Sequence, residues 1–161
     1  MSHILVKLAD FAANNNPDDT LSTYGIGSTL AVILDDEKAK VGGMLHFMFP
    51  YSVANSLKIK DYPPMYADLG ITQLVKSCLE LGASKNALSA RLAGGALMLG
   101  RGVAQSISDG NISAARKILS KMGIIVTAEN TGGHHMRTVR LDIANGKAYL
   151  KQPDSNWEEL R

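Results

Sequence analysis

Residues 23–32 read TYGIGSTLAV and residues 42–50 read GGMLHFMFP. The first stretch is typical of a tight glycine turn followed by an apolar strand, and the second of a strand that carries one histidine, His46. If the two strands pair through a short turn near Asp35, the side chain of Thr29 meets the imidazole across the ladder. A hydroxyl or thiol beside an imidazole is the minimum of a hydrolase site. The pattern therefore favours paired strands that build a site, with a threonine where a nucleophile is expected.

The glycines before the strand have a second possible use. Gly25 and Gly27 permit a sharp turn or the close approach of another backbone, such as that of a substrate. In an extended chain alternate residues share a face, so Thr23 and Thr29 would lie on the face of the glycines and Ser28 on the other. A purely structural interpretation competes with catalysis, because a lone histidine on an apolar strand is usually a hydrogen-bonded core or rim residue. Threonine is also common in strands.

Size and composition indicate an ordinary globular protein. The chain has 161 residues, of which 45% are hydrophobic and 20% charged, and its net charge is +2. This suffices for a core, so we expect a single domain over residues 1–161. Lysine and arginine are spread along the chain, which gives no electrostatic case for nucleic acid. We expect no signal peptide, no membrane insertion and a cytoplasmic location, and Cys78, the single cysteine, excludes an intrachain disulfide.

Apolar runs of strand length recur along the chain and outnumber the helical segments. The runs cover residues 4–7, 30–34, 41–49, 87–95, 124–129, 137–143 and 147–151. Asn145-Gly146 separates the last pair and is a strong hairpin signal. The polar residues 151–161 are expected to form a loose tail.

Two segments have helical periodicity instead. They cover residues 66–81 and about 111–122, and Gly82 and Gly123 are placed to end them. The candidate N-caps of the second helix are Ser108, Asp109 and Asn111. Because strands predominate, we predict an α+β fold, a layered sandwich of mixed β-sheets with two main helices.

Six stretches in unbroken order resemble the CheD family of bacterial chemoreceptor glutamine deamidases. The family pattern has Thr-x-Gly-x-Gly-Ser-Cys before an apolar strand, then a glycine-rich strand with a histidine before Phe-Met-x-Pro. Those segments stand here as TYGIGSTLAV and GGMLHFMFP. The other four are YAD at 66–68, LGAS at 81–84, GGA at 94–96, and AENTGG at 128–133 with Arg137 behind it. The resemblance covers residues 10–151 and implies a CheD-like fold, similar to cysteine-hydrolase deamidase domains.

In that family a cysteine attacks a receptor glutamine, a histidine activates it and a threonine helps to hold the histidine. The resemblance assigns these roles to Thr29, His46 and Thr23, and at Thr29 the chain departs from the family. The candidate substrate-binding residues are Gly25, Gly27 and Ser28. Two weaker departures are ISDGN at 107–111, where the family has Ile-Gly-x-Arg-Asn, and Asn130 in place of an aspartate.

The threonine weakens the implied chemistry. A free thiol has a pKa near ~8.5 and forms a thiolate beside a histidine at modest cost, whereas an aliphatic hydroxyl is far less acidic. Threonine enzymes use their own N-terminal amine as the base, which an internal Thr29 lacks. Ser28 should point away from His46, and Cys78 lies on the apolar stripe of a helix. We therefore expect weak or absent deamidation, with a non-catalytic chemotaxis adaptor as the alternative.

The resemblance also implies two partners and no cofactor. The partners are the cytoplasmic helices of methyl-accepting chemoreceptors and a CheC-type phosphatase. A metal site at His134-His135 is not favoured, because adjacent strand residues diverge and neither an acidic residue nor a cysteine is close in the sequence. A solvated loop is the interpretation that this pair supports.

Overall fold

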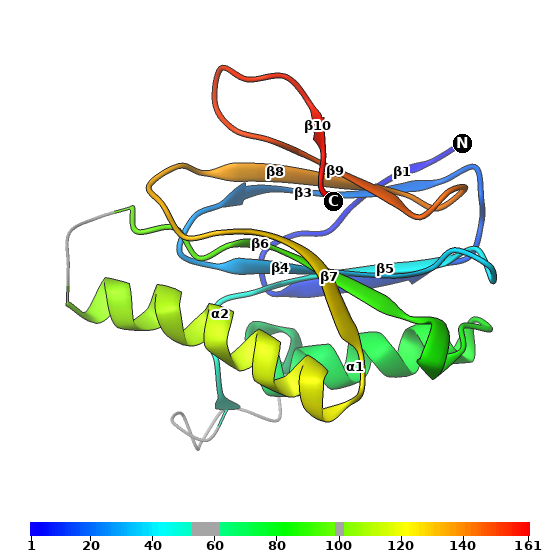
Figure 1. The fold of residues 1–161 in the computed structure, drawn as a ribbon, viewed down its shortest axis with the longest axis horizontal. Coiled ribbons are helices and arrows are strands. Elements are labelled where there is room, and N and C mark those ends of the chain that lie inside the picture. The colour runs from blue at the N-terminus through cyan, green and yellow to red at the C-terminus, as the bar shows by residue number, and fades with distance from the viewer. Residues whose placement is uncertain (53–61, 99–101) are drawn as a thin grey trace.

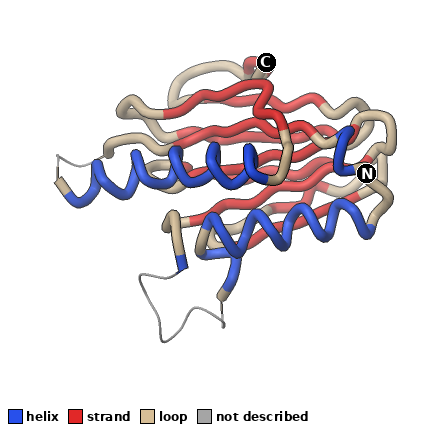
Figure 2. The backbone as a smooth tube through the Cα atoms, turned by 60° about the horizontal axis from the view of Figure 1, so that its bottom comes forward, coloured by secondary structure: helices blue, strands red, loops and turns tan. Residues whose placement is uncertain are grey.

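The computed structural model describes residues 1–52, 62–98 and 102–161. Within these ranges two five-stranded β-sheets lie face to face (Figure 1). Two α-helices cover one of them, the inner sheet, on the face that points away from the other, the outer sheet. Figure 2 shows both helices on the same side of the strands. The arrangement is the α+β sandwich of mixed sheets that the sequence predicts.

The outer sheet has the strand order β1-β3-β8-β9-β10. Its strands are β1 (His3–Leu5), β3 (Thr20–Ile26), β8 (Arg137–Asp142), β9 (Lys147–Lys151) and β10 (Glu158–Glu159). Strands β1 and β3 are parallel and the other neighbours antiparallel. The β8–β9 hairpin turns at Asn145-Gly146, where Gly146 has φ 66° and so takes the conformation that made this pair a turn signal.

The inner sheet has the strand order β2-β5-β4-β6-β7. Its strands are β2 (Asp10–Asn14), β5 (Val41–Phe47), β4 (Leu30–Asp36), β6 (Ser89–Gly94) and β7 (Ile125–Thr131). Every residue of β4 and β5 is buried, because the outer sheet covers one face and the helices cover the other. This is why both strands read as continuous apolar runs.

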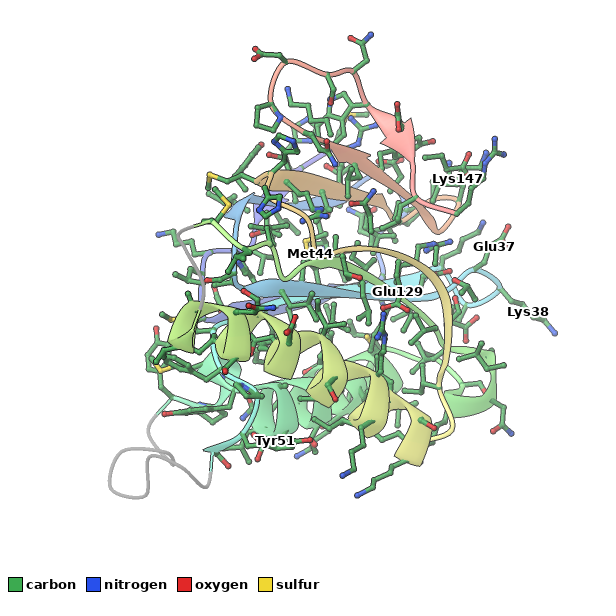
Figure 3. All side chains as sticks on the ribbon, turned by 60° about the vertical axis from the view of Figure 1, so that its left-hand side comes forward. Glu37, Lys38, Met44, Tyr51, Glu129 and Lys147 are labelled. Atoms are coloured by element: carbon green, nitrogen blue, oxygen red, sulfur yellow. The ribbon has the colours of Figure 1, made fainter. Side chains whose placement is uncertain are left out.

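Each face of the inner sheet belongs to a different core. On β4, Leu30, Val32 and Leu34 pack toward the helices, whereas Ala31 and Ile33 pack toward the outer sheet. The same alternation on β5 sends Leu45 and Phe47 to the helices and Met44 to the outer sheet. Figure 3 shows Met44 in the layer between the two sheets. His46 follows Met44 by two residues and therefore also faces the outer sheet.

The helices are α1 (Ala67–Glu80) and α2 (Val103–Lys121). The short 3-10 turn η3 (Pro63–Met65) precedes α1, and η4 (Lys85–Ala87) lies between α1 and β6. No helix in the described ranges is long and apolar enough to cross a membrane. The predicted start of the second helix near Asn111 is wrong, because Ser108, Asp109 and Asn111 lie inside α2 rather than at its N-terminus. Ser108 and Asn111 are polar residues on the buried face, and they interrupt the apolar periodicity that marks the rest of the helix.

The predicted loose tail is also wrong in its last residues. Glu158 and Glu159 form β10, which pairs with β9, and the N–H of Leu160 donates to the carbonyl of Ala148. Leu160 is buried in the core between the sheets, and the guanidinium of Arg140 lies 5.1 Å from the ring centre of Trp157. These contacts anchor a segment whose composition is polar.

The single domain over residues 1–161 stays a prediction.

Cys78 provides the first testable prediction. Its side chain has no exposed surface and lies on α1 beneath the inner sheet, and burial raises the pKa of its thiol to about 12. Because the thiolate is the reactive form, we expect a thiol reagent at neutral pH to label the native protein at least ~tenfold more slowly than the urea-unfolded protein. Equal labelling rates would contradict this prediction.

Candidate active site

His46 lies at the centre of the candidate site. It sits on β5 between Ala31 of β4 and Asp10 of β2, and only 2% of its surface is exposed. Its Nε2 is 2.6 Å from Oγ1 of Thr29, and its Nδ1 is 2.9 Å from Oγ1 of Thr23. The predicted geometry, with one threonine on each side of the imidazole, is therefore confirmed. The catalytic roles of the three residues stay predictions.

The chain reaches this geometry by a different path from the one expected. Residues 23–29 do not form one extended segment, because Gly25 has φ 66° and the β3–β8 register shifts between Thr23 and Ile26. Thr23 therefore belongs to the outer sheet, whereas Thr29 immediately precedes β4 of the inner sheet. The turn lets two threonines six positions apart contact opposite nitrogens of one ring.

The segment that carries Thr29 is held by backbone contacts with the end of β6. The N–H of Gly95 donates to the carbonyl of Thr29, and the N–H of Ala96 donates to the carbonyl of Gly27, each at 2.8 Å. Gly94 has φ 126°, and a Cβ at this position would collide with the carbonyl oxygen of Thr29. The GGA motif at 94–96 is therefore required by close backbone packing behind the candidate nucleophile.

Asn111 holds the same segment from the side of the helices. Its Nδ2 donates to the carbonyl of Ser28 at 3.1 Å and to the carbonyl of Met48 at 2.9 Å. The sequence singled out Asn111 as a possible helix cap and as the last residue of the ISDGN segment, and neither pointed to this contact. The signal that could have found it is a polar residue in the middle of an apolar helical stripe.

Burial keeps the imidazole neutral. Loss of solvent around His46 lowers its pKa to about 4, so at neutral pH one ring nitrogen carries a proton and the other a lone pair. If Nδ1–H donates to Thr23, Nε2 is free to accept the hydroxyl proton of Thr29. In this tautomer His46 has the geometry of a general base and Thr23 the geometry of its orienting partner.

The three predicted substrate-binding residues differ in accessibility. Gly25 is exposed and Ser28 is half-buried, but Gly27 is buried. A Cβ at Gly27 would lie 3.1 Å from Cγ of Met98, so this methionine covers the glycine. Gly27 is therefore covered by this side chain, and the substrate-binding roles of the three residues stay predictions. The hydrogen bonds of His46 go to the two threonines rather than to Ser28, as expected.

The loop around His134 and His135 is exposed, as predicted, and Nδ1 of His134 lies 3.1 Å from the carbonyl of Leu97. Arg137 behind this loop is 5% exposed. Its Nε donates to Oδ1 of Asn130 at 2.7 Å, and its other nitrogens reach backbone carbonyls. Within the described part of the chain no carboxylate pairs with this buried guanidinium.

This arrangement gives a second prediction. Burial lowers the pKa of Arg137, which is the signature of a charge without full compensation. Asn130→Asp would place a carboxylate on Nε at an existing contact, so we expect the free energy of unfolding to rise by about 1–2 kcal/mol. Urea denaturation checks it, with Asn145→Asp in the exposed β8–β9 turn as the control. A loss of stability in Asn130→Asp alone would show that carboxylate desolvation outweighs the pairing.

Comparison with known proteins places the chain in a family. A crystal structure of a Neisseria meningitidis protein of family model DUF152 aligns with TM-score 0.44 and 10% identity over 81% of this chain and 62% of that chain. The family described as CheD chemotactic sensory transduction matches residues 48–152. A Syntrophus aciditrophicus protein named probable chemoreceptor glutamine deamidase CheD 1 is 41% identical over 99% of this chain and 100% of its own length. A Solibacter usitatus protein with the corresponding name is 40% identical over 94% and 90%. The chain belongs to the CheD family.

Proposed function

We propose that this chemotaxis protein binds a glutamine side chain of a chemoreceptor at the Thr29–His46 site and hydrolyses it slowly or not at all. The observation that carries the proposal is the 2.6 Å contact between Oγ1 of Thr29 and Nε2 of His46, with Thr23 on Nδ1. The names of the CheD relatives, probable chemoreceptor glutamine deamidases, support the choice of substrate.

The reaction would run through an ester. Oγ1 of Thr29 attacks the carbonyl carbon of the glutamine side chain while its proton passes to Nε2 of His46. The tetrahedral intermediate expels ammonia, which takes that proton, and a water activated by the same nitrogen then cleaves the ester to give glutamate. Within the described residues no loop or turn carbonyl accepts from the N–H groups of Ser28 and Thr29, and we propose these two groups as the donors for the oxyanion.

Two features make this route slow. The hydroxyl of Thr29 is far less acidic than a thiol, and a base whose pKa is about 4 has little affinity for its proton. A thiolate at the same place would raise the pKa of His46 by its charge, and a neutral hydroxyl cannot do so. The methyl group of threonine also occupies space beside the attacking oxygen.

The same observation favours a second function, that of a non-catalytic adaptor. The contacts around Thr29 have the geometry of a catalytic site, but the hydroxyl of Thr29 lacks the acidity that the reaction needs. Such a protein would occupy chemoreceptor helices, or a CheC-type phosphatase, without turnover. The names of the CheD relatives support the receptor as a partner, and the phosphatase is proposed from the family resemblance alone.

Mass spectrometry of a chemoreceptor cytoplasmic fragment incubated with the protein separates the two functions. A deamidase produces a one-dalton increase at specific glutamines, and His46→Ala abolishes it. An adaptor leaves the mass unchanged but binds the fragment, or the phosphatase, in isothermal titration calorimetry. A chain that neither changes the mass nor binds either partner would overturn the proposal.

A further inference from the structure

One buried amide connects the segment that carries Thr29 with the segment that carries His46, and these two residues are called the dyad below. Asn111 lies on α2 with no exposed surface, and its Nδ2 donates to the carbonyls of Ser28 and Met48. Ser28 is bonded to Thr29, and Met48 follows His46 by two residues. The two hydrogen bonds therefore use both protons of one nitrogen to connect the two arms of the site, which are the segment at Ser28 and Thr29 and the segment from His46 to Met48.

We propose that Asn111 is a positioning residue that sets the separation between Oγ1 of Thr29 and Nε2 of His46. The inference rests on the proposed function, since it takes these two atoms as the reacting pair. Asn111 touches neither of them and acts through the backbone on each side.

The position of the two carbonyls explains why an amide is needed. The β4–β5 ladder ends at the pair Leu30–Phe47, so Ser28 and Met48 lie just beyond the last strand hydrogen bonds. Each segment has its own backbone contact, Thr29 with Gly95 and Met48 with Met65, and the side chain of Asn111 bonds to both segments. The amide continues the connection between the strands past the end of the ladder.

The energetics favour a role beyond packing. Oδ1 of Asn111 is buried, and within the described residues it has no hydrogen-bond partner. A buried acceptor without a partner costs about 1–3 kcal/mol, a cost that an apolar side chain would avoid. The asparagine is present in spite of this cost, and it supplies two hydrogen-bond donors to the segments that carry Thr29 and His46.

Ser108 offers a matched control on the same helix. It is 2% exposed, and its Oγ donates to the carbonyl of Ala96 at 2.9 Å. It lies less than one helical turn before Asn111 and has a similar burial and a similar bond to a carbonyl. Its bond is to the carbonyl of Ala96, whose N–H donates to Gly27, so Ser108 lies one hydrogen bond further from Thr29 than Asn111 does and has no bond to the Met48 segment.

The test measures the ring nitrogens of His46 by NMR, which requires no turnover. In Asn111→Ala we expect the segments at Ser28 and Met48 to move apart and water to reach the imidazole. The pKa of His46 should then rise by about one unit or more toward its ordinary value. In a Thr29→Cys background we expect alkylation of that cysteine at neutral pH to slow by about tenfold or more. Ser108→Ala should change both quantities less than Asn111→Ala does, even where its loss of stability is equal.

Two further arms keep the proposal falsifiable. Asn111→Leu has a similar size without the donors and should behave like Asn111→Ala, whereas Asn111→Ser keeps one donor and should fall between it and the natural chain. If these variants do not fold, hydrogen-bond couplings from Nδ2 to the carbonyl carbons of Ser28 and Met48 can be measured in the natural protein. Missing couplings, or an unchanged His46 in a folded Asn111→Ala, would overturn the proposal. Failure to deamidate a receptor would overturn only the proposed enzymatic function.

Discussion

Thr29→Cys is expected to raise the rate of glutamine hydrolysis by ~10³-fold or more over the natural chain. The new thiol would lie at the place of a hydroxyl that is already 2.6 Å from Nε2 of His46, with Thr23 holding the opposite nitrogen. Removal of the nucleophile of a serine protease costs on the order of 10⁶ in kcat, so a gain of this size is within reach of a single side chain. The measurement is the one-dalton change in a receptor fragment.

The acidity of the thiol explains most of the gain. A thiolate beside His46 forms an ion pair that raises the pKa of the imidazole and lowers that of the thiol. The change also removes the threonine methyl group, which widens the approach to the attacking atom. We therefore expect the new cysteine to titrate below the ordinary value for a thiol, which alkylation rates as a function of pH would show.

Two control variants separate chemistry from access. Thr29→Ser removes the methyl group but keeps a hydroxyl, so it should recover only a small part of the gain. Thr29→Cys with His46→Ala should lose the gain and the low thiol pKa together. If Thr29→Cys folds but shows neither activity nor a low pKa, the site has lost more than its nucleophile. The adaptor function would then be the one to pursue.

The pairing of β4 and β5 and the contact of Thr29 with His46 were predictable from local patterns, whereas the place of Thr23 beside His46 came from the family resemblance. The buried strands read as apolar runs, and the pairing Ala31–His46 follows from a short connection between them. The path from Thr23 to Thr29 was not predictable, because an isolated strand pattern does not say where a chain leaves one sheet and enters another. The chain changes sheets near Gly25, but the sequence does not distinguish a glycine with φ 66° from a glycine in an extended strand.

Polar residues account for the other errors. Ser108 and Asn111 looked like the start of a helix because such residues usually cap one, and only the packed structure shows that their partners are carbonyls just beyond the ends of β-strands. The tail 151–161 is polar in composition, and its order comes from Leu160 and from β10, which are contacts with distant residues. Tertiary partners therefore decided each case in which local sequence gave the wrong answer.

The second large effect is on stability, which is expected to fall by about 2 kcal/mol between about pH 7 and about pH 4.5 through His46 alone. Burial lowers the pKa of this residue to about 4 in the folded protein, whereas in the unfolded chain it titrates near ~6.5. Between these values the unfolded state binds more protons than the folded state, so the free energy of unfolding decreases as the pH falls. Above ~6.5 both states are neutral and the contribution vanishes.

A comparison with His46→Gln isolates this contribution. Other groups also bind protons as the pH falls, including Asp35, whose pKa is raised by burial and whose protonation therefore favours the folded state. These groups are common to both proteins, so the difference in the pH dependence of urea unfolding reports His46. The natural chain should lose about 2 kcal/mol more than the variant over this interval. Equal losses would mean that water or a rearranged threonine already stabilises the imidazolium in the folded state, and that the neutral base on which the proposed mechanism depends is not present.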